Sequence, residues 1–155
     1  MIVEHILADK GHDVITTGPE RTLSETARLL DEKRVRAVVV SDADHPVLGI
    51  ISERDIARAV AQRGAAALNE PVSQHMTAKV ITCTRSCTVR DLMELMTHRR
   101  IRHVPVVEGG RLNGIVSIGD IVKRRLAELE AEGHVMQDYT GTEYSAGRST
   151  PGRRF

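Results

Sequence analysis

The sequence predicts a mixed α/β (α+β) fold, in which two β-α-β-β-α repeats pack with pseudo-twofold symmetry into one compact module. One observation is an eight-residue motif that occurs twice, as GIISERDI at 49–56 and GIVSIGDI at 114–121, with five identical positions. The other is that β-branched runs and segments of helical period follow the same order in both halves. One repeat alone would bury its sheet poorly, so the halves are expected to share a core.

The first half contains a leading helix, a strand, a helix, two strands joined by a hairpin turn, and a helix. They are placed at 2–7, 14–17, 23–33, 35–40, 47–51 and 55–62. The second helix is the best marked, because Thr22 and Glu25 form a capping box before an apolar stripe. Gly64 ends the last helix.

The second half repeats this order. Residues 80–83 match 14–17 at an offset of 66, and Thr88 with Asp91 takes the place of the capping box. The second hairpin turn is one residue shorter, so the eight-residue motifs match at an offset of 65. A deletion confined to a turn is what a genuine duplication tolerates.

The match divides the chain into four segments. They are repeat 1 with its N-terminal segment at 1–64, a linker that contains a helix at 65–78, repeat 2 with a long C-terminal helix at 79–139, and a mobile tail at 140–155. The last helix is extended to Tyr139 because its apolar stripe continues at helical spacing. The tail is rich in Gly, Ser, Thr and Arg, which is typical of mobile chain ends.

Composition excludes several classes of protein. The formal net charge of +1 offers no strong field for nucleic acid, so no nucleic-acid partner is expected. No apolar run approaches the roughly 20 residues of a membrane span, and the N-terminus lacks a signal peptide. Together with two cysteines that have no pairing pattern, these features predict a soluble cytoplasmic protein without membrane association.

No metal site, cofactor or catalytic group is predicted. Cys83 and Cys87 form a CxxxC pair without matching histidines, and the corresponding positions of the first repeat carry no thiol. Two small thiols are therefore favoured over a zinc or disulfide role. Ser52 and Ser117 lack a nearby base or oxyanion pattern, so nucleophilic catalysis is not expected.

Each eight-residue motif is expected to end a buried strand and begin a helix, with its glycine as a small turn residue. Its Ser (Ser52 or Ser117) then lies in the turn, and its Asp (Asp55 or Asp120) lies near the first free N–H groups of the helix. The carboxylate can accept from ribose hydroxyls, while the hydroxyl and the helix N–H groups can donate to a phosphate. The alternative is that these side chains only cap their helices. Two copies at corresponding places favour a ligand site.

These features resemble a tandem cystathionine-β-synthase (CBS) domain pair, also called a Bateman module. The resemblance is carried by the two Gly-hydrophobic-hydrophobic-Ser-x-x-Asp motifs, by RHVPV at 102–106 and by the β-α-β-β-α order. It covers residues 2–139 and is nearest to the stand-alone bacterial type, in which the pair is the whole protein.

The resemblance implies a module that binds adenosine-containing ligands in the clefts between its repeats and dimerises into a flat disc of four CBS domains. The ligands of the family include AMP, ADP, ATP, S-adenosylmethionine and NADH. By motif position, Ser52 with Asp55 and Ser117 with Asp120 would contact phosphate and ribose in two related sites. The resemblance implies further contacts to the base or phosphates by Thr16, Thr82, Arg102, His103 and Pro105.

The two sites are expected to differ. The first repeat has Ala37 where the second has His103, so its pocket wall is less able to pair with phosphate. Conversely, Arg54 offers a charge that Gly119 does not. We expect the site at Ser117 to hold the tighter nucleotide.

Two further pairs of basic residues have two interpretations each. Arg36 and Arg102 occupy equivalent places, and either ligand contact or ordinary rim charge is open for both. Lys10 and His12 could close over a phosphate, or they could belong to a solvated loop.

The sequence thus predicts a non-enzymatic regulatory module that senses energy or metabolic state through an adenosine ligand and signals to an unknown protein partner. The alternative is a constitutive dimeric interaction scaffold with no physiological nucleotide. Tolerance of Asp55→Ala and Asp120→Ala in function would favour the scaffold.

Overall fold

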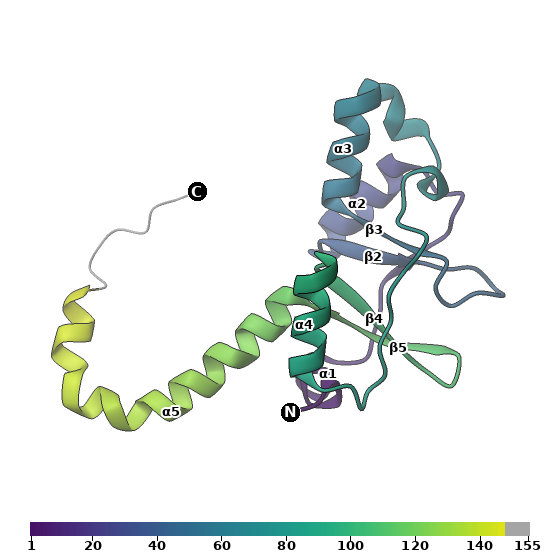
Figure 1. Ribbon diagram of the computed structural model, residues 1–155. Helices are drawn as coiled ribbons and strands as arrows, with labels where there is room; N and C mark the ends of the chain where they lie inside the picture. The colour runs from purple at the N-terminus through teal and green to yellow at the C-terminus, as the bar shows by residue number, and fades with distance from the viewer. Residues whose placement is uncertain (148–155) are drawn as a thin grey trace. The chain divides into compact units, whose positions relative to one another are not determined.

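The computed structural model describes the backbone of residues 1–147 and the side chains of residues 1–133 (Figure 1). The chain consists of two compact units, Met1–Ile118 and Gly119–Phe155. Helix α5 (Ile118–Gly147) continues past its predicted end at Tyr139, and no proline interrupts it between Ile118 and Gly147. The predicted mobile tail therefore begins inside α5, and residues 148–155 lie outside the described residues. None of the described helices combines the length and the apolar character of a bilayer span.

The first repeat has the predicted β-α-β-β-α order. Its elements are β1 (Thr16–Thr17), α2 (Leu23–Lys33), β2 (Ala37–Val40), β3 (Gly49–Ser52) and α3 (Glu53–Arg63), and α1 (Val3–Lys10) precedes them. β1 runs parallel to β2, and β2 runs antiparallel to β3 with Val39 opposite Ile50. The two helices α2 and α3 lie together beside this sheet (Figure 1). The mixed helix-and-sheet fold is therefore confirmed.

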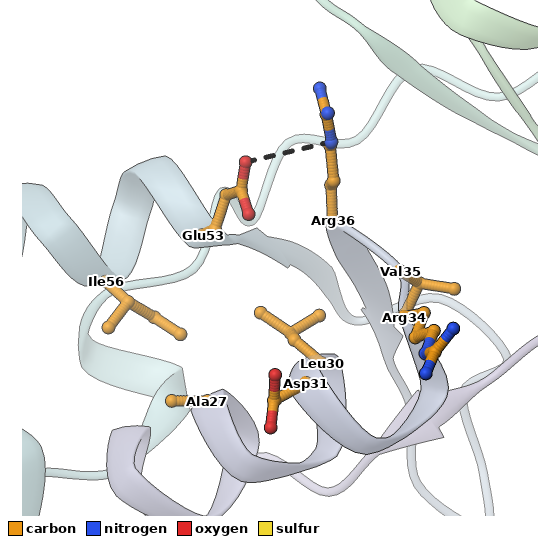
Figure 2. Close-up of a pocket in the computed structure, with 8 residues that line it drawn as sticks. All are labelled: Ala27, Leu30, Asp31, Arg34, Val35, Arg36, Glu53 and Ile56. Atoms are coloured by element: carbon orange, nitrogen blue, oxygen red, sulfur yellow. Dashed lines mark ion pairs between the residues drawn. The ribbon is translucent and has the colours of Figure 1, made fainter.

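The helix ends of the two repeats correspond closely. Thr22 Oγ1 accepts a hydrogen bond from Glu25 N at 3.1 Å, and Glu25 Oε1 accepts one from Thr22 N at 3.3 Å, which completes the predicted capping box. α2 ends at Arg34 in the left-handed conformation, with φ 54° and ψ 43°, beside the cavity drawn in Figure 2. Arg100 ends α4 (Val89–Arg99) with the same two angles, so the repeats match in single backbone torsions.

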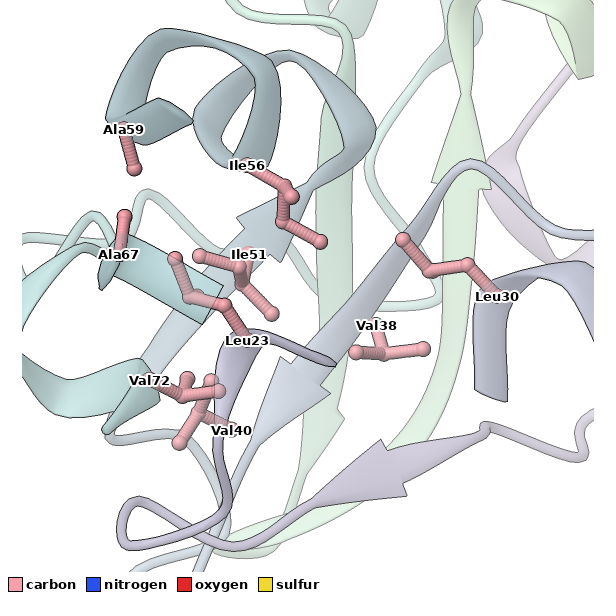
Figure 3. Close-up of a cluster of buried hydrophobic side chains, with 9 residues drawn as sticks. All are labelled: Leu23, Leu30, Val38, Val40, Ile51, Ile56, Ala59, Ala67 and Val72. Carbon is pink, nitrogen blue, oxygen red and sulfur yellow. The ribbon is translucent and has the colours of Figure 1, made fainter. Parts of the chain in front are cut away.

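The core of the first repeat lies between its sheet and its helices. Figure 3 shows the buried side chains that form it: Leu23, Leu30, Val38, Val40, Ile51, Ile56, Ala59, Ala67 and Val72. Val38 and Val40 alternate along β2 and so share one face, whereas Val39 points to the other face and is equally buried. β2 is therefore covered on both faces, as its run of β-branched residues predicts.

The second repeat departs from the predicted order in its first strand. β4 (His103–Glu108) and β5 (Arg111–Ser117) form a two-stranded antiparallel sheet, and the predicted strand at 80–83 is reduced to one bridge between Cys83 and Val106. In the first repeat, Val39 N donates to Ile15 O at 3.3 Å and so fixes β1. The residue equivalent to Val39 is Pro105, which has no N–H and cannot make this bond.

Each repeat is covered by the segment that precedes the other repeat. Helix α1 lies on the second repeat. There the buried side chain of Leu7 packs against Gly114, and Val3 N donates a hydrogen bond to Cys87 O at 2.8 Å. The linker consists of the 3₁₀ turns η1 (Gly64–Asn69) and η2 (Val72–Gln74), and the segment after η2 lies on the first repeat. There Ile50 and Thr77 exchange two backbone hydrogen bonds of 3.0 and 2.9 Å.

This exchange of segments corrects the prediction that the motif glycines are turn residues. Gly49 and Gly114 both lie within strands, β3 and β5. A Cβ at Gly49 would lie 2.8 Å from the carbonyl oxygen of Thr77, and one at Gly114 would lie 2.7 Å from Leu7 Cδ2. Glycine is therefore required for the close approach of the covering segments, not for a turn.

Candidate functional site

Ser52 and Asp55 are close together at the start of α3, as the motif predicts. Ser52 is the last residue of β3 and the N-cap of α3. Asp55 Oδ2 accepts hydrogen bonds from Ser52 N at 2.8 Å and from Ser52 Oγ at 2.9 Å, while Asp55 N donates to Ser52 Oγ at 3.3 Å. These bonds form a reciprocal capping box, so the two residues cap the helix.

Capping uses only part of the Asp55 carboxylate. Its second oxygen, Oδ1, lies 3.6 Å from Arg58 Nη1 in an ion pair, and the side chain is 15% exposed. A carboxylate has about four acceptor positions on its two oxygens. The capping role therefore leaves acceptor positions on Oδ1 for a ligand hydroxyl.

The other predicted residues of the first site come from β1, β2 and α3. Thr16 is exposed and pairs with Val39 across the parallel strands. Arg36 directly precedes β2, and its carbonyl oxygen accepts a hydrogen bond from Glu53 N at 3.0 Å. Arg54 is exposed in the first turn of α3. Backbone pairing thus brings Arg36 next to the end of β3, where Ser52 lies.

The second repeat repeats this arrangement. His103 pairs with Ser117 across β4 and β5, and Arg102 O accepts a hydrogen bond from Ile118 N at 2.9 Å. Pro105 is buried on β4, and its carbonyl oxygen accepts from Cys83 N at 3.0 Å, which brings the exposed Thr82 near it. Asp120 lies in the first turn of α5.

A cavity of about 380 Å³ lies in the first repeat, where the end of α2 meets the starts of β2 and α3 (Figure 2). Its lining consists of an apolar floor and a charged rim: Ala27, Leu30, Val35 and Ile56, and Asp31, Arg34, Arg36 and Glu53. Of the predicted site residues, the lining contains only Arg36. Arg36 Nε lies 4.0 Å from Glu53 Oε1.

Sequence reasoning missed the other three rim residues, Asp31, Arg34 and Glu53. One signal was available, because the pattern Arg-hydrophobic-Arg at 34–36 recurs at 100–102. Arg34 has a left-handed backbone conformation, which is uncommon outside glycine and asparagine. The residue type at position 34 therefore gave no sign of this conformation.

The N-terminal segment is attached to β5. Lys10 Nζ donates to Ile115 O at 2.8 Å. His12 Nδ1 lies 3.1 Å from the Asn113 side-chain oxygen, and its Nε2 lies 3.4 Å from Glu4. Lys10 and His12 are therefore exposed residues that also contact the protein.

Both cysteines are free and half-buried. Burial, assisted by the nearby Cys87 and Glu108, raises the pKa of the Cys83 thiol to about 12. Burial also raises the pKa of Cys87, with a smaller contribution from Asp91. Both side chains are therefore neutral thiols near pH 7. The residues that the structure describes include no cluster of three or more His, Cys, Asp or Glu side chains suited to a metal ion.

The chain thus contains two related repeats, and in each of them a serine ends the last strand directly before a helix. A model of the CBS domain matches residues 3–62 and again 72–127, and the chain therefore belongs to the CBS domain family. The resemblance deduced from the two serine motifs is thus confirmed.

Solved structures of CBS-domain proteins share this fold. A CBS-domain containing protein from Agrobacterium tumefaciens is 51% identical, with a TM-score of 0.78 over 81% of this chain and 99% of its own. A CBS domain protein from Pyrobaculum aerophilum, complexed with AMP, is 32% identical, with a TM-score of 0.69 over 77% and 89% of the two chains. The CBS domain pair of protein MJ0100, in complex with 5′-methylthioadenosine and S-adenosyl-L-methionine, is 29% identical, with a TM-score of 0.71 over 79% and 98%.

Proposed function

We propose that this protein is a non-catalytic regulatory module that binds adenosine-containing ligands in the clefts between its CBS repeats and signals their level to a protein partner. The observation that carries the proposal is the similarity to two CBS structures that hold AMP, or 5′-methylthioadenosine and S-adenosylmethionine. The proposed ligands are AMP, ADP and ATP, with NADH and S-adenosylmethionine as further candidates. The module acts in the cytoplasm, where free thiols such as Cys83 and Cys87 stay reduced.

The chemistry of the helix starts supports this proposal. Ser52 and Ser117 each close a strand beside the N-terminus of a helix, where free N–H groups favour an anion. The free acceptor positions of Asp55 suit a ribose hydroxyl, and Asp120 is its counterpart by sequence. The proposed contacts to the base and to the 5′ group of the ligand are Thr16, Arg36 and Arg54 in the first site, and Thr82, Arg102, His103 and Pro105 in the second.

Thermal unfolding with and without ligand tests the proposal. A ligand at about 100 times its dissociation constant should add roughly 2.7 kcal/mol to the free energy of unfolding. Asp55→Ala and Asp120→Ala should each reduce this gain, measured against the same variant without ligand. Asp91→Ala is the matched control, because Asp91 occupies the same third position of α4 but lies outside both proposed sites. Absence of a shift with AMP, ATP, NADH and S-adenosylmethionine would count against the proposal.

We further propose that the module is a homodimer. Helix α5, taken by itself, carries an apolar stripe in which Val122, Leu126 and Leu129 are 51%, 54% and 45% exposed. Exposed apolar stripes at helical spacing mark contact surfaces. Leu126→Lys should shift the mass measured by light scattering from dimer toward monomer, whereas Arg125→Lys should not.

The same stripe favours the second candidate function, a constitutive dimeric scaffold that needs no nucleotide. Partner capture that is independent of ligand and unchanged by Asp55→Ala and Asp120→Ala would favour the scaffold over the sensor. Loss of capture in the two Asp variants would favour the sensor.

A further inference from the structure

The two repeats place an arginine at the same point relative to the helix start. Arg36 O accepts from Glu53 N at 3.0 Å, and Arg102 O accepts from Ile118 N at 2.9 Å. Each arginine therefore sits beside the residue that follows the motif serine. This backbone hydrogen bond is the same in both repeats, and the difference lies in the side chain of its donor residue, Glu53 or Ile118.

In the first repeat, a carboxylate offsets this arginine. Glu53 Oε1 lies 4.0 Å from Arg36 Nε, and Figure 2 shows the two side chains facing each other. In the second repeat the place of Glu53 is taken by Ile118, which is 46% exposed and carries no charge. The residue that follows Ser117 therefore supplies no carboxylate to offset Arg102.

A second acid of the cavity rim is also missing from the second repeat. Asp31 lies on the rim together with Arg34, whereas its counterpart by sequence is Thr97, beside Arg100. The four charged rim residues of the first repeat, together with Arg54 and Asp55 of the neighbouring helix start, carry no net charge. The corresponding residues of the second repeat, including Asp120, carry a net charge of +1, and His103 replaces Ala37.

We propose that the two sites select adenosine ligands by the charge of the 5′ substituent, an inference that rests on the proposed function. The site at Ser117 takes ligands with a 5′ phosphate, because the uncharged Ile118 does not offset Arg102, which lies beside a helix N-terminus. The site at Ser52 takes ligands whose 5′ group carries no phosphate, such as a thioether or a sulfonium, because Glu53 both occupies Arg36 and repels a phosphate.

Reciprocal exchange of the two neighbouring residues tests this division by isothermal titration calorimetry. A unit charge about 4 Å away in bulk water changes an affinity by roughly fivefold. Ile118→Glu should therefore weaken AMP binding by about fivefold and ATP binding by more, while binding of 5′-methylthioadenosine, which lacks a phosphate, stays within about twofold. Glu53→Ile should create a second AMP site or tighten a weak one. Both positions are exposed, with the Glu53 side chain at 60%, so both variants should fold.

The matched control is Ile118→Gln, which adds a polar group of the same size as Glu but no charge. It should leave AMP binding within about twofold, and the Ile118→Glu effect should shrink as salt is raised. In the wild-type protein, AMP and 5′-methylthioadenosine should bind together without competition. Equal loss of both ligands in Ile118→Glu, or an equal effect of Ile118→Gln, would overturn the charge selection while leaving the sensor function intact. A wild-type protein that binds neither ligand would overturn the proposed function itself.

Discussion

A methyl group at Gly49 would strike the backbone of the linker. In Gly49→Ala, the new Cβ would lie 2.8 Å from Thr77 O and 2.9 Å from Met76 Cγ, and it would also meet Met76 Sδ. The side chain of Met76 can move aside, but the Thr77 carbonyl cannot move without disturbing its hydrogen bonds. Thr77 exchanges two backbone hydrogen bonds with Ile50, at 3.0 and 2.9 Å.

These contacts set the size of the effect. Overpacking a closed contact costs about 1–3 kcal/mol. Weakening the two hydrogen bonds costs about 0.5–1.5 kcal/mol each, and the lower flexibility of alanine in the unfolded chain returns about 0.5–1 kcal/mol. We expect Gly49→Ala to lower the free energy of unfolding by about 2–3 kcal/mol. For a chain of this length, that corresponds to a fall in Tm of about 4–12 °C.

Urea denaturation followed by far-ultraviolet circular dichroism measures this loss, since the chain has no tryptophan to report by fluorescence. The matched control is Gly18→Ala, whose Cβ would meet only Arg21 Cγ, at 3.9 Å. This control should stay within about 0.5 kcal/mol of the wild type. If Gly49→Ala were as stable as Gly18→Ala, the explanation of the motif glycine by close packing would be wrong.

Three further predictions concern other contacts. Gly114→Ala should cost about 1–3 kcal/mol alone but almost nothing in a Leu7→Ala background, because the three atoms nearest to the new methyl group all belong to the Leu7 side chain; a double-mutant cycle in urea measures the coupling. The pKa of Glu70 is lowered from 4.5, chiefly by its 2.7 Å hydrogen bond from Arg63, so its contribution to stability is present above about pH 4.5 and is lost as pH falls through the lowered pKa. Glu70→Gln should remove this acid dependence of the urea midpoint, and an unchanged profile between pH 3 and pH 7 would contradict the assignment. Because the pKa of Cys83 is raised from 9.0 to about 12, stability should be lost as pH rises through that range, and Cys83→Ala should flatten this alkaline slope of the Tm.

The candidate site was predictable where its parts lie close together in the chain. Ser52 and Asp55 are three residues apart, so the motif alone places them on one helix start, and the bonds between them are local. The pairing of Arg36 with Glu53 was not predictable, since it depends on how β2 and β3 pair. Asp31 and Arg34 reach the same rim only because α2 packs against α3.

The sequence by itself determined the duplication, the helix starts and the order of elements, because each depends on residues within a turn or two of one another. Periodicity and side-chain bonds over three residues are local, and Thr22 with Glu25 shows this directly. Only the tertiary structure decided that residues 80–83 do not form a strand, because the missing donor belongs to Pro105 on another segment. It also decided that α1 covers the second repeat and the linker covers the first, which gives Gly49 and Gly114 their role. These features depend on contacts between residues far apart in the chain, and local patterns carry no information about such contacts.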